Sequence, residues 1–475
     1  MDWLKSAFSG IVPKIYTSSG PYDVGVFDYD WVPKDFDFKA AFSTDAGKHI
    51  SIFPDSLSLR CYYPGIKNGS TDNHIDWLPE PKNVYAEGYG SFVKIPSWAA
   101  RKLFGFAESY FKMPAYYGID PIKFIHEKDE LNNKLHTSAD KNKSIAPESY
   151  CKLPVAIFSH GLAGNRTTYS AICREMASYG VVVLALEHRD GSASASYLAT
   201  KETALPYHDF STYMNSTNKT IGSLKDNSNQ NKIEEFGPER LEFQQKKLNS
   251  RVREIYETVS ELHRLSSAES DPQLKNCNLF HKLGLSSRLD FDQMIVVGHS
   301  FGSSSVLEAI DSSTNIKYTK NPKSPFKAAV VLDPWMFAVD RSNPRIEIPT
   351  LIIRSEHFLN WKEHYVEEVQ YFKKSFNMDT NTPEQKLSIP GKLYSINIYK
   401  AGHQYFSDLY LLFPWVAKLK NTTFTANPER VVSLTNEITI EFLRKVLVTQ
   451  LPKGSSESSH ILDNFETTNP EISFD

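Results

Sequence analysis

The chain has 475 residues and a mass of 54.0 kDa, and its 40% hydrophobic content is enough for a sizeable core. It carries 53 basic and 56 acidic residues, and the net charge of -3 gives no electrostatic basis for binding nucleic acid. Its four cysteines are widely spaced and form neither a Cys-x-x-Cys pair nor a disulfide framework. The composition therefore indicates a globular protein from a reducing compartment, with no nucleic-acid partner.

The first residues show no export signal, because no basic region is followed by an apolar stretch. Asp2 stands where N-myristoylation requires glycine. No apolar run along the chain is long enough to cross a bilayer. We therefore expect a cytoplasmic protein without a signal peptide or a transmembrane helix. Residues 1–17 are predicted to be a separate amphipathic segment, with Trp3 and Phe8 among its apolar residues.

Short β-branched runs recur through the middle of the chain and predict strands. Several are apolar throughout, as expected of strands covered on both faces. Helical patterns lie between them, most clearly over 241–262, after Gly237 and Pro238. Alternating strands and helices predict an α/β fold with a mostly parallel central sheet flanked by helices. The predicted strands are 155–158, 181–186, 294–297, 328–332, 351–353 and 395–399.

A single catalytic domain is predicted over residues 18–450, since no repeat and no linker separate two comparable halves. Two polar stretches without periodicity, about 126–150 and 211–235, are predicted to be loop insertions. The Ser- and acid-rich residues 454–475 are predicted to form a disordered tail.

A nucleophile elbow is predicted at residues 298–302, Gly-His-Ser-Phe-Gly, directly after the apolar run 294–297. A serine at a sharp strand-to-helix turn adopts a strained backbone, and flanking glycines leave room for the crossing strand and helix. A buried serine between two glycines is the alternative interpretation. The flanking strand and helix favour Ser300 as a nucleophile.

A serine hydroxyl needs a histidine base, and the histidine needs a carboxylate. Asp333 directly follows the predicted strand 328–332, with Asp340 and Glu356 as rival acids. His403 follows the last predicted strand and is the predicted base. The other histidines downstream of the acid are His357 and His364, and His299, inside the elbow, is predicted to have a packing role.

Two backbone N–H groups are needed to stabilise the oxyanion of acyl transfer. One is predicted from Phe301, the residue after the nucleophile. The other is predicted from Leu162, in the Gly-rich loop after strand 155–158. Such loops are common in α/β proteins, so a plain turn is the alternative.

These residues belong to an ordered set of motifs that resembles one family, the plasma and intracellular type II platelet-activating factor acetylhydrolases. Its most specific member is Glu-His-Arg-Asp-Gly-Ser-Ala-Ser-Ala at 187–195. The resemblance spans about 18–450, interrupted by the polar insertions. The other matching stretches are 20–25, 59–64, 158–162, 298–302, 332–337 and 403–406.

The resemblance implies an α/β-hydrolase fold and a serine-dependent phospholipase A2 that acts without calcium, metal or cofactor. Its substrates would be phospholipids with an acetyl, short or oxidised sn-2 chain, as for a 1-alkyl-2-acetylglycerophosphocholine esterase. It assigns Ser300 as nucleophile, Asp333 as acid and His403 as base, with the N–H groups of Leu162 and Phe301 as oxyanion hole. The spacings between the three triad residues are longer here than in the family, which leaves the chain-length preference open.

The run from Glu187 to Ser196 follows a predicted strand and is expected to shape the pocket rim through a buried polar network. Peripheral membrane contact is predicted through one of two stretches, and for each the alternative is packing on its own domain. One stretch contains Trp3 and Phe8. The other contains Trp98, Leu103, Phe104 and Phe106.

Two other functions remain open at this point: a general carboxylesterase or lipase on other small esters, and a catalytically silent lipid-binding protein.

Overall fold

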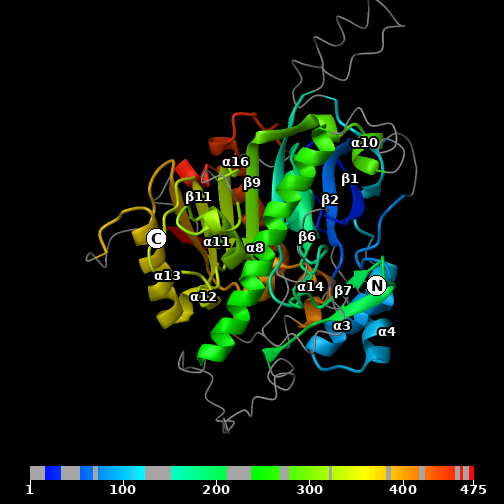
Figure 1. Ribbon diagram of the computed structural model, residues 1–475, viewed down its shortest axis with the longest axis horizontal. Helices are drawn as coiled ribbons and strands as arrows, with labels where there is room; N and C mark the ends of the chain where they lie inside the picture. The colour runs from blue at the N-terminus through cyan, green and yellow to red at the C-terminus, as the bar shows by residue number, and fades with distance from the viewer. Residues whose placement is uncertain are drawn as a thin grey trace, which may run out of the picture.

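The computed structural model describes residues 16–33, 54–67, 73–110, 112–123, 151–210, 237–267, 278–319, 324–380, 387–416, 423–454, 460–463 and 470–474. Within these residues, an eleven-stranded sheet forms the centre of the molecule (Figure 1). Its strand order is β13-β12-β11-β10-β9-β5-β6-β2-β1-β3, with β4 paired to β2.

Six neighbouring strands of the sheet run parallel to one another. Each of the six strands predicted from the sequence falls on one of them, so the mostly parallel sheet is confirmed. The six are β5 (Leu153–Ser159), β6 (Val182–Glu187), β9 (Leu289–His299), β10 (Ala328–Leu332), β11 (Thr350–Ser355) and β12 (Leu393–Ile398).

The remaining strands extend this parallel centre, and the sequence patterns did not predict them. The long strands β1 (Asp23–Trp31) and β2 (Leu57–Ile66) pair antiparallel, and β2 pairs antiparallel with β6. The short strands are β3 (Tyr116–Tyr117) and β4 (Asp120–Pro121), while β7 (Ala195–Leu198) and β8 (Thr203–Pro206) form a separate hairpin.

The prediction of a disordered tail over 454–475 is wrong for the part that the structure describes. β13 (Ile472–Phe474) adds to the sheet antiparallel to β12. Ile461 and Leu462 are also buried against the core. Neither contact could be predicted from the sequence, because the apolar residues of this segment are scattered among polar ones. A strand of three residues is also too short to give a periodic signal.

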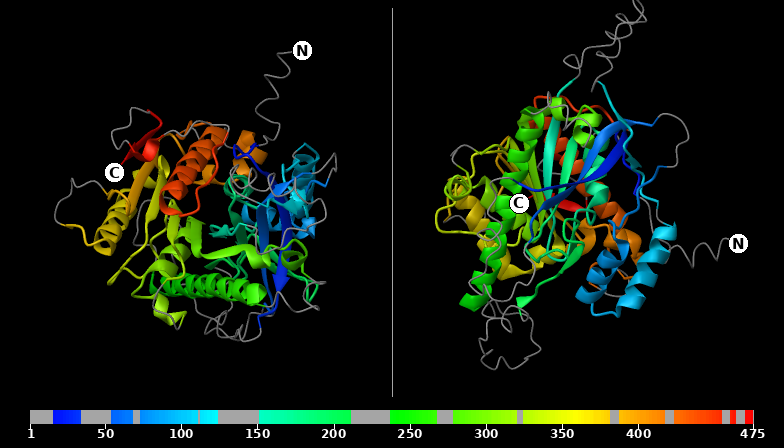
Figure 2. Two further views of the ribbon diagram at one scale, coloured as in Figure 1. Left: turned by 90° about the horizontal axis from the view of Figure 1, so that it is seen from above. Right: turned by 45° about the vertical axis from the view of Figure 1, so that its right-hand side comes forward.

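Helices cover both faces of the sheet. Figure 2 shows α8 (Pro238–Ser267) and α16 (Pro428–Val446) on opposite sides of it. Successive side chains of a strand point to opposite faces, and in β5 Val155 packs in the α8 core whereas Ala156 packs in the α16 core. This two-sided burial explains why the parallel strands are apolar throughout.

The other helices complete these two layers. α11 (Phe301–Ile310) and α13 (Lys362–Ser375) contribute to the same core as α8, and α6 (Ser170–Ser178) contributes to that of α16. The remaining helices of the described residues are α3 (Lys82–Phe92), α4 (Ser97–Tyr110), α10 (Leu279–Lys282), α12 (Glu356–Asn360) and α14 (Leu409–Leu412), with 3-10 turns η3 (Ser286–Arg288), η4 (Asn315–Lys317), η5 (His403–Phe406) and η6 (Ile461–Asp463).

Helix α4 corrects part of the predicted membrane contact. Phe104 is only 4% exposed, and its ring lies 5.0 Å from that of Phe413. Leu103 is half-buried against the same core. Trp98 and Phe106 are 64% and 48% exposed. Phe104 therefore belongs to the core, and only Trp98 and Phe106 are well exposed.

The other predicted membrane contact, Trp3 and Phe8, lies outside the described residues, as do both polar insertions, 126–150 and 211–235. Of the predicted segment 1–17, the structure describes only the end, where Tyr16 is 8% exposed. In the part of the chain that the structure covers, every helix is too short or too polar to traverse a bilayer.

Candidate active site

The predicted strand–turn–helix around Ser300 is present. β9 ends at His299, α11 begins at Phe301, and Ser300 between them has φ 57° and ψ -122°. A Cβ on Gly298 would lie 2.4 Å from the carbonyl oxygen of Gly302, and one on Gly302 would lie 2.0 Å from that of Ser159. Both positions therefore exclude any side chain, and the turn that exposes Ser300 depends on both glycines.

The structure brings the predicted base and acid to this serine. Asp333 directly follows β10 and His403 follows β12, so both lie, like Ser300, at the carboxyl ends of parallel strands. The Nε2 atom of His403 is 2.9 Å from the Oγ atom of Ser300. Its Nδ1 atom is 2.8 Å from Oδ2 of Asp333. Because a carboxylate only accepts, Nδ1 carries the hydrogen and Nε2 is free to accept the serine proton.

Asp333 is fully buried and is held by a residue that the sequence analysis missed. Ser355 donates its backbone N–H to Oδ1 at 2.7 Å and its hydroxyl to Oδ2 at 2.6 Å. Two hydrogen bonds to the charged form, together with His403, satisfy a carboxylate that burial would otherwise disfavour. The signal for Ser355 was its place at the end of β11, the strand next to β10.

The ring of His403 is held between two other rings. Phe358 stacks on it with a centroid distance of 4.5 Å, and the ring of His299 is also 4.5 Å away. Nε2 of His299 donates to the backbone carbonyl of His403 at 3.1 Å, while Tyr169 donates its hydroxyl to Nδ1 at 2.8 Å. The predicted packing role of His299 is confirmed, and hydrogen bonds add to it.

The loop that carries Leu162 passes over the nucleophile. A Cβ on Gly161 would lie 3.1 Å from the Cβ of Ser300. The N–H of Ala163 donates to the carbonyl of Ser192 at 2.8 Å, which anchors the loop to the segment after β6. Phe301 is the first residue of α11, and the first N–H groups of a helix have no intrahelical acceptor. The two residues predicted to supply the oxyanion donors are therefore chain neighbours of Gly161, which contacts Ser300, and of Ser300 itself.

The rival acids, and the rival base His364, form hydrogen bonds with residues other than Ser300 and His403. Oδ1 of Asp340 accepts from the N–H of Ser342 at 3.0 Å, and Glu356 accepts from the N–H of Lys400 at 2.5 Å. Nε2 of His364 accepts the backbone N–H of Met336 at 3.0 Å. The remaining rival is His357, which is exposed, with its ring 6.3 Å from that of His403.

Burial of His364 leads to a prediction for stability. Desolvation, with Arg354 nearby, lowers its pKa from 6.5 to about 3. Below pH 6.5 His364 is protonated in the unfolded chain but stays neutral in the folded chain. The free energy of unfolding therefore falls as the pH drops. From pH 8 to pH 5 this residue is expected to account for a loss of about 2 kcal/mol. His364→Gln should remove that part of the pH dependence of the free energy of unfolding, measured in urea.

The absolute stability of this variant does not enter the comparison, because Gln also loses the stacking on Trp361. His460→Gln, at a side chain that is 75% exposed, is the control and should leave the pH dependence unchanged. Equal slopes for His364→Gln and the parent protein would contradict the prediction.

A second serine, histidine and acid lie in hydrogen-bonding order close by. Oγ of Ser159 is 2.7 Å from Nε2 of His188, whose Nδ1 contacts Glu254. The three residues are 0%, 0% and 3% exposed. No ester can reach this serine, whereas Ser300 is partly exposed. Burial also lowers the pKa of His188, which favours a structural role in its neutral form.

The run from Glu187 to Ser196 forms the expected buried network. It joins the end of β6 to β1, to α8 and to the loop after β5, and Ser196 donates to Glu187 at 2.6 Å. The ion pairs are Glu187 with Arg166, Arg189 with Asp30 at 2.8 Å, and Asp190 with Arg251 at 3.2 Å.

Ligand atoms of His299, Asp333 and His403 lie within 4.8 Å of one another, a spacing that a metal ion could use. In the present arrangement hydrogen bonds engage both ring nitrogens of each histidine and both oxygens of the carboxylate. The donor set therefore suits proton transfer, and a metal would have to displace these bonds.

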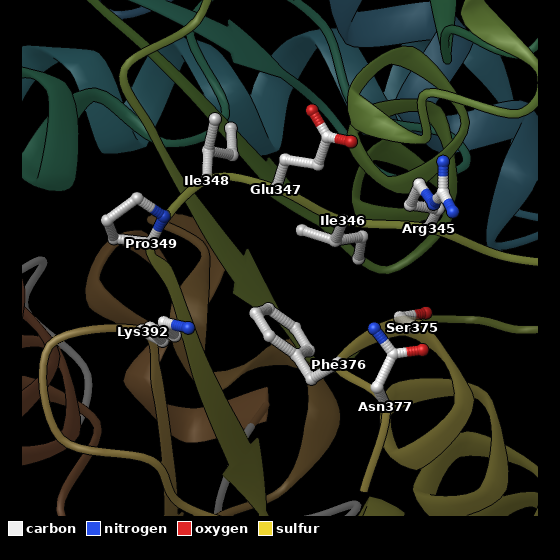
Figure 3. A pocket seen from close by; sticks show the side chains of 9 residues that line it. All are labelled: Arg345, Ile346, Glu347, Ile348, Pro349, Ser375, Phe376, Asn377 and Lys392. Atoms are coloured by element: carbon white, nitrogen blue, oxygen red, sulfur yellow. The ribbon is translucent and has the colours of Figure 1, made fainter.

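A cavity of about 490 Å³ opens at the other end of the sheet (Figure 3). Residues 345–349, which precede β11, face residues 375–377 across it, and Lys392, which precedes β12, lies beside them. The cavity is thus at the amino ends of these strands, whereas Ser300 lies at the carboxyl ends. It is separate from the candidate active site.

Known proteins resemble the chain over most of its length. A platelet-activating factor acetylhydrolase of Gallus gallus is 27% identical over 393 residues, which cover 82% of this chain and 78% of that protein. A putative phospholipase A2 of Schizosaccharomyces pombe (strain 972 / ATCC 24843) is 27% identical over 429 residues, or 86% of this chain and 88% of that protein.

Among solved structures, a ferulic acid esterase from Streptomyces cinnamoneus covers 97% of this chain and 99% of its own, with a TM-score of 0.54 and 14% identity. At that identity the likeness supports the α/β-hydrolase fold alone. The family model described as "Platelet-activating factor acetylhydrolase, isoform II" matches residues 124–464, and with the relatives it identifies a serine ester hydrolase. The chain belongs to the platelet-activating factor acetylhydrolase, isoform II, family.

Proposed function

We propose that the chain hydrolyses the sn-2 acetyl, short or oxidised acyl ester of phospholipids, without calcium, through Ser300, His403 and Asp333. The observation that carries the proposal is the continuous hydrogen-bonded path from the serine through the histidine to the buried carboxylate, at 2.9 and 2.8 Å. The family match and the name of the yeast relative support a phospholipid as substrate.

In the first step the Oγ atom of Ser300 attacks the sn-2 carbonyl while His403 takes its proton at Nε2. Asp333 holds the imidazole in the required tautomer and stabilises the imidazolium. The N–H groups of Leu162 and Phe301 donate to the oxyanion. When the carbonyl re-forms, the sn-2 C–O bond breaks, and His403 returns the proton to the lyso-phospholipid that leaves.

In the second step a water molecule takes the place of the leaving group. His403 accepts its proton as the water oxygen attacks the acyl carbon, and the same N–H groups hold the new oxyanion. Collapse of this intermediate releases the short acid and returns the proton to Ser300. Every proton transfer passes through one ring nitrogen.

The test is a panel of phosphatidylcholines with sn-2 chains from acetyl to oleoyl, compared with simple acetyl esters, and each rate is measured with and without EDTA. The proposal predicts fastest turnover on acetyl and short or oxidised chains, and no loss of rate with EDTA. Equal or better turnover on the simple esters would favour a general carboxylesterase instead. A fluorophosphonate probe that fails to label Ser300 would favour a silent lipid-binding protein.

We also propose that the chain meets its substrate at a membrane through the surface formed by α3 and α4, which lie together in Figure 1. Phe92 and Val93 are exposed there beside Trp98 and Phe106, at 48% and 51%. Lys94, Arg101 and Lys102 are exposed among them. Apolar rings with interspersed cations suit the interface of a bilayer. On its other side, α3 packs against the segment that anchors the Leu162 loop.

Replacing Trp98 and Phe106 together with alanine is expected to lower partitioning onto phosphatidylcholine vesicles by about tenfold, because each half-exposed ring loses its apolar contact with lipid. Co-sedimentation with vesicles measures this. Val448→Ala, which removes an apolar side chain that is 78% exposed elsewhere, is the matched control. Unchanged partitioning of the double variant, or an equal loss in the control, would contradict the proposed surface.

A further inference from the structure

Arg251 is a fully buried arginine on α8 whose guanidinium reaches the loop that carries Leu162. Its Nη1 donates to the backbone carbonyl of His160. Its Nη2 donates to the hydroxyl of Ser192 at 2.6 Å. Ser192 in turn accepts the N–H of Ala163 through its own carbonyl, at 2.8 Å. The guanidinium therefore holds the loop on both sides of Leu162.

The same guanidinium also lies over the ring of Phe301, with its central carbon 4.7 Å from the ring centroid. A planar cation at this distance attracts the face of an aromatic ring, and the attraction is stronger in a buried site. Phe301 begins α11 and carries the other candidate donor. Arg251 thus contacts both the loop that carries the N–H group of Leu162 and the side chain of Phe301, which carries the other N–H group. These two residues lie 139 positions apart in the chain (301 minus 162).

Asp190 balances the charge of Arg251 in this buried position. Its Oδ2 lies 3.2 Å from Nε of Arg251, and its Oδ1 accepts the N–H of Ser192 at 2.9 Å. Burial opposes ionisation of Asp190, but Arg251 and Lys247 keep its pKa below the ordinary value. Because a buried cation is stable only when it is paired and hydrogen-bonded, the guanidinium has little freedom to move.

We propose that Arg251 is a positioning residue that fixes the two N–H donors of the oxyanion hole relative to each other. This inference rests on the proposed function, in which Leu162 and Phe301 donate to the oxyanion formed at Ser300. The value of such donors depends on their distance from the position of the oxyanion, so a shift of either support lowers the rate of the chemical step. A lysine lacks the planar fork and cannot keep the contacts together.

The experiment compares Arg251→Lys with Arg288→Lys in the full chain. Arg288 is also buried, at 4% exposed, and also donates to backbone carbonyls, those of Ile122 and Cys151. It lies just before β9, at the opposite end of that strand from Ser300. Complete labelling with a fluorophosphonate counts the active sites, so that kcat is obtained per labelled site. The inhibition constant of a trifluoromethyl ketone, which forms a tetrahedral adduct, reports on the oxyanion hole itself.

Arg251→Lys is expected to lower kcat per labelled site by about 100-fold, the usual effect of losing one oxyanion donor. Its KM for a short-chain ester should change by less than about threefold, since ground-state binding is untouched. The inhibition constant should rise by a factor similar to the loss in kcat/KM. The pH dependence of kcat/KM should stay in place, because Arg251 does not contact His403. Arg288→Lys should leave all four quantities near those of the parent.

A purely structural role would give fewer labelled sites but a normal kcat per site and an unchanged inhibition constant, and this result would overturn the inference. If Arg251→Lys fails to fold, Ser192→Ala tests the same arrangement. It removes the hydroxyl that accepts from Nε and Nη2 of Arg251 and donates to Asp190, and it keeps the ion pair of Arg251 with Asp190. It should show the same pattern with about a tenfold loss of kcat, and normal kinetics would overturn the inference. Failure of the probe to label the parent protein would refute the proposed function itself, before any variant is compared.

Discussion

Replacing Ser300 with alanine is expected to lower kcat by about 10⁵- to 10⁶-fold and to abolish labelling by fluorophosphonates. The variant keeps the fold, because alanine needs no more room than serine at this turn and the glycines that permit it are unchanged. It lacks the oxygen that attacks the ester, so only substrate binding and the oxyanion donors remain. Hydrolysis of an acetyl-phosphatidylcholine, followed by titration of the released acid, measures the loss.

Ser159→Ala is the matched control for this experiment, because Ser159 also contacts a histidine that is backed by an acid. It is fully buried, and its removal should leave fluorophosphonate labelling and most of the turnover intact. The reverse ranking of the two variants, or turnover by Ser300→Ala at the parent rate, would refute the proposed mechanism.

Asp333→Asn is expected to lower kcat by about 10⁴-fold while the fold persists. The amide is isosteric with the carboxylate, but its NH₂ group cannot accept the Nδ1 hydrogen of His403 at the 2.8 Å position. The imidazole would then favour the tautomer that places the hydrogen on Nε2, where it opposes the Ser300 hydroxyl. Steady-state kinetics on the same substrate, with circular dichroism to verify folding, measures the effect.

Two further variants test the assignment of Asp333 as the acid. Asp340→Asn changes the rival acid, which is partly exposed and contacts Ser342, and kcat should stay within about threefold of the parent. Ser355→Ala removes one of the two hydrogen bonds from Ser355 to Asp333, and about a tenfold loss is expected. A loss in Asp340→Asn as large as that in Asp333→Asn would contradict the assignment of the acid.

The positions of Ser300, Asp333 and His403 could be predicted because each follows an apolar strand of the parallel sheet. Parallel strands direct their carboxyl ends to one edge, so residues at those ends meet even when they are far apart in the chain. The apolar runs themselves were visible because both faces of these strands are covered. The order of these three residues along the chain and their positions after predicted strands were sufficient to predict that they lie together.

The residues around the candidate triad could not be predicted in the same way. Phe358 stacks on His403, and Arg251 contacts the loop of Leu162 and the ring of Phe301, only because separate elements pack together. Neither residue carries a local pattern that differs from an ordinary helix. Ser355 is an intermediate case, because its position at the carboxyl end of β11 was a signal that was not used.

The strands β1 and β2 were missed for a different reason. β2 contains Arg60 and Pro64, and β1 contains Asp28, and charged residues and proline argue against a buried strand. In the structure Arg60 and Asp28 are register partners and form an ion pair at 2.6 Å, in which the Arg60 side chain is buried and that of Asp28 is 28% exposed. The charge of Arg60 on β2 is neutralised by Asp28 on the neighbouring strand β1, and a single sequence does not show which strands are neighbours.

The pairing of β13 with β12 limits how far the chain can be shortened for protein production. Ile472, Ser473 and Phe474 occupy the hydrogen-bonding groups along the last half of β12, at Ile396, Asn397 and Ile398. Shortening the chain before residue 470 would leave those groups bare on an apolar strand, which is a template for pairing with another molecule. Such a trimmed protein would keep every residue of the candidate active site and still become prone to aggregation in storage.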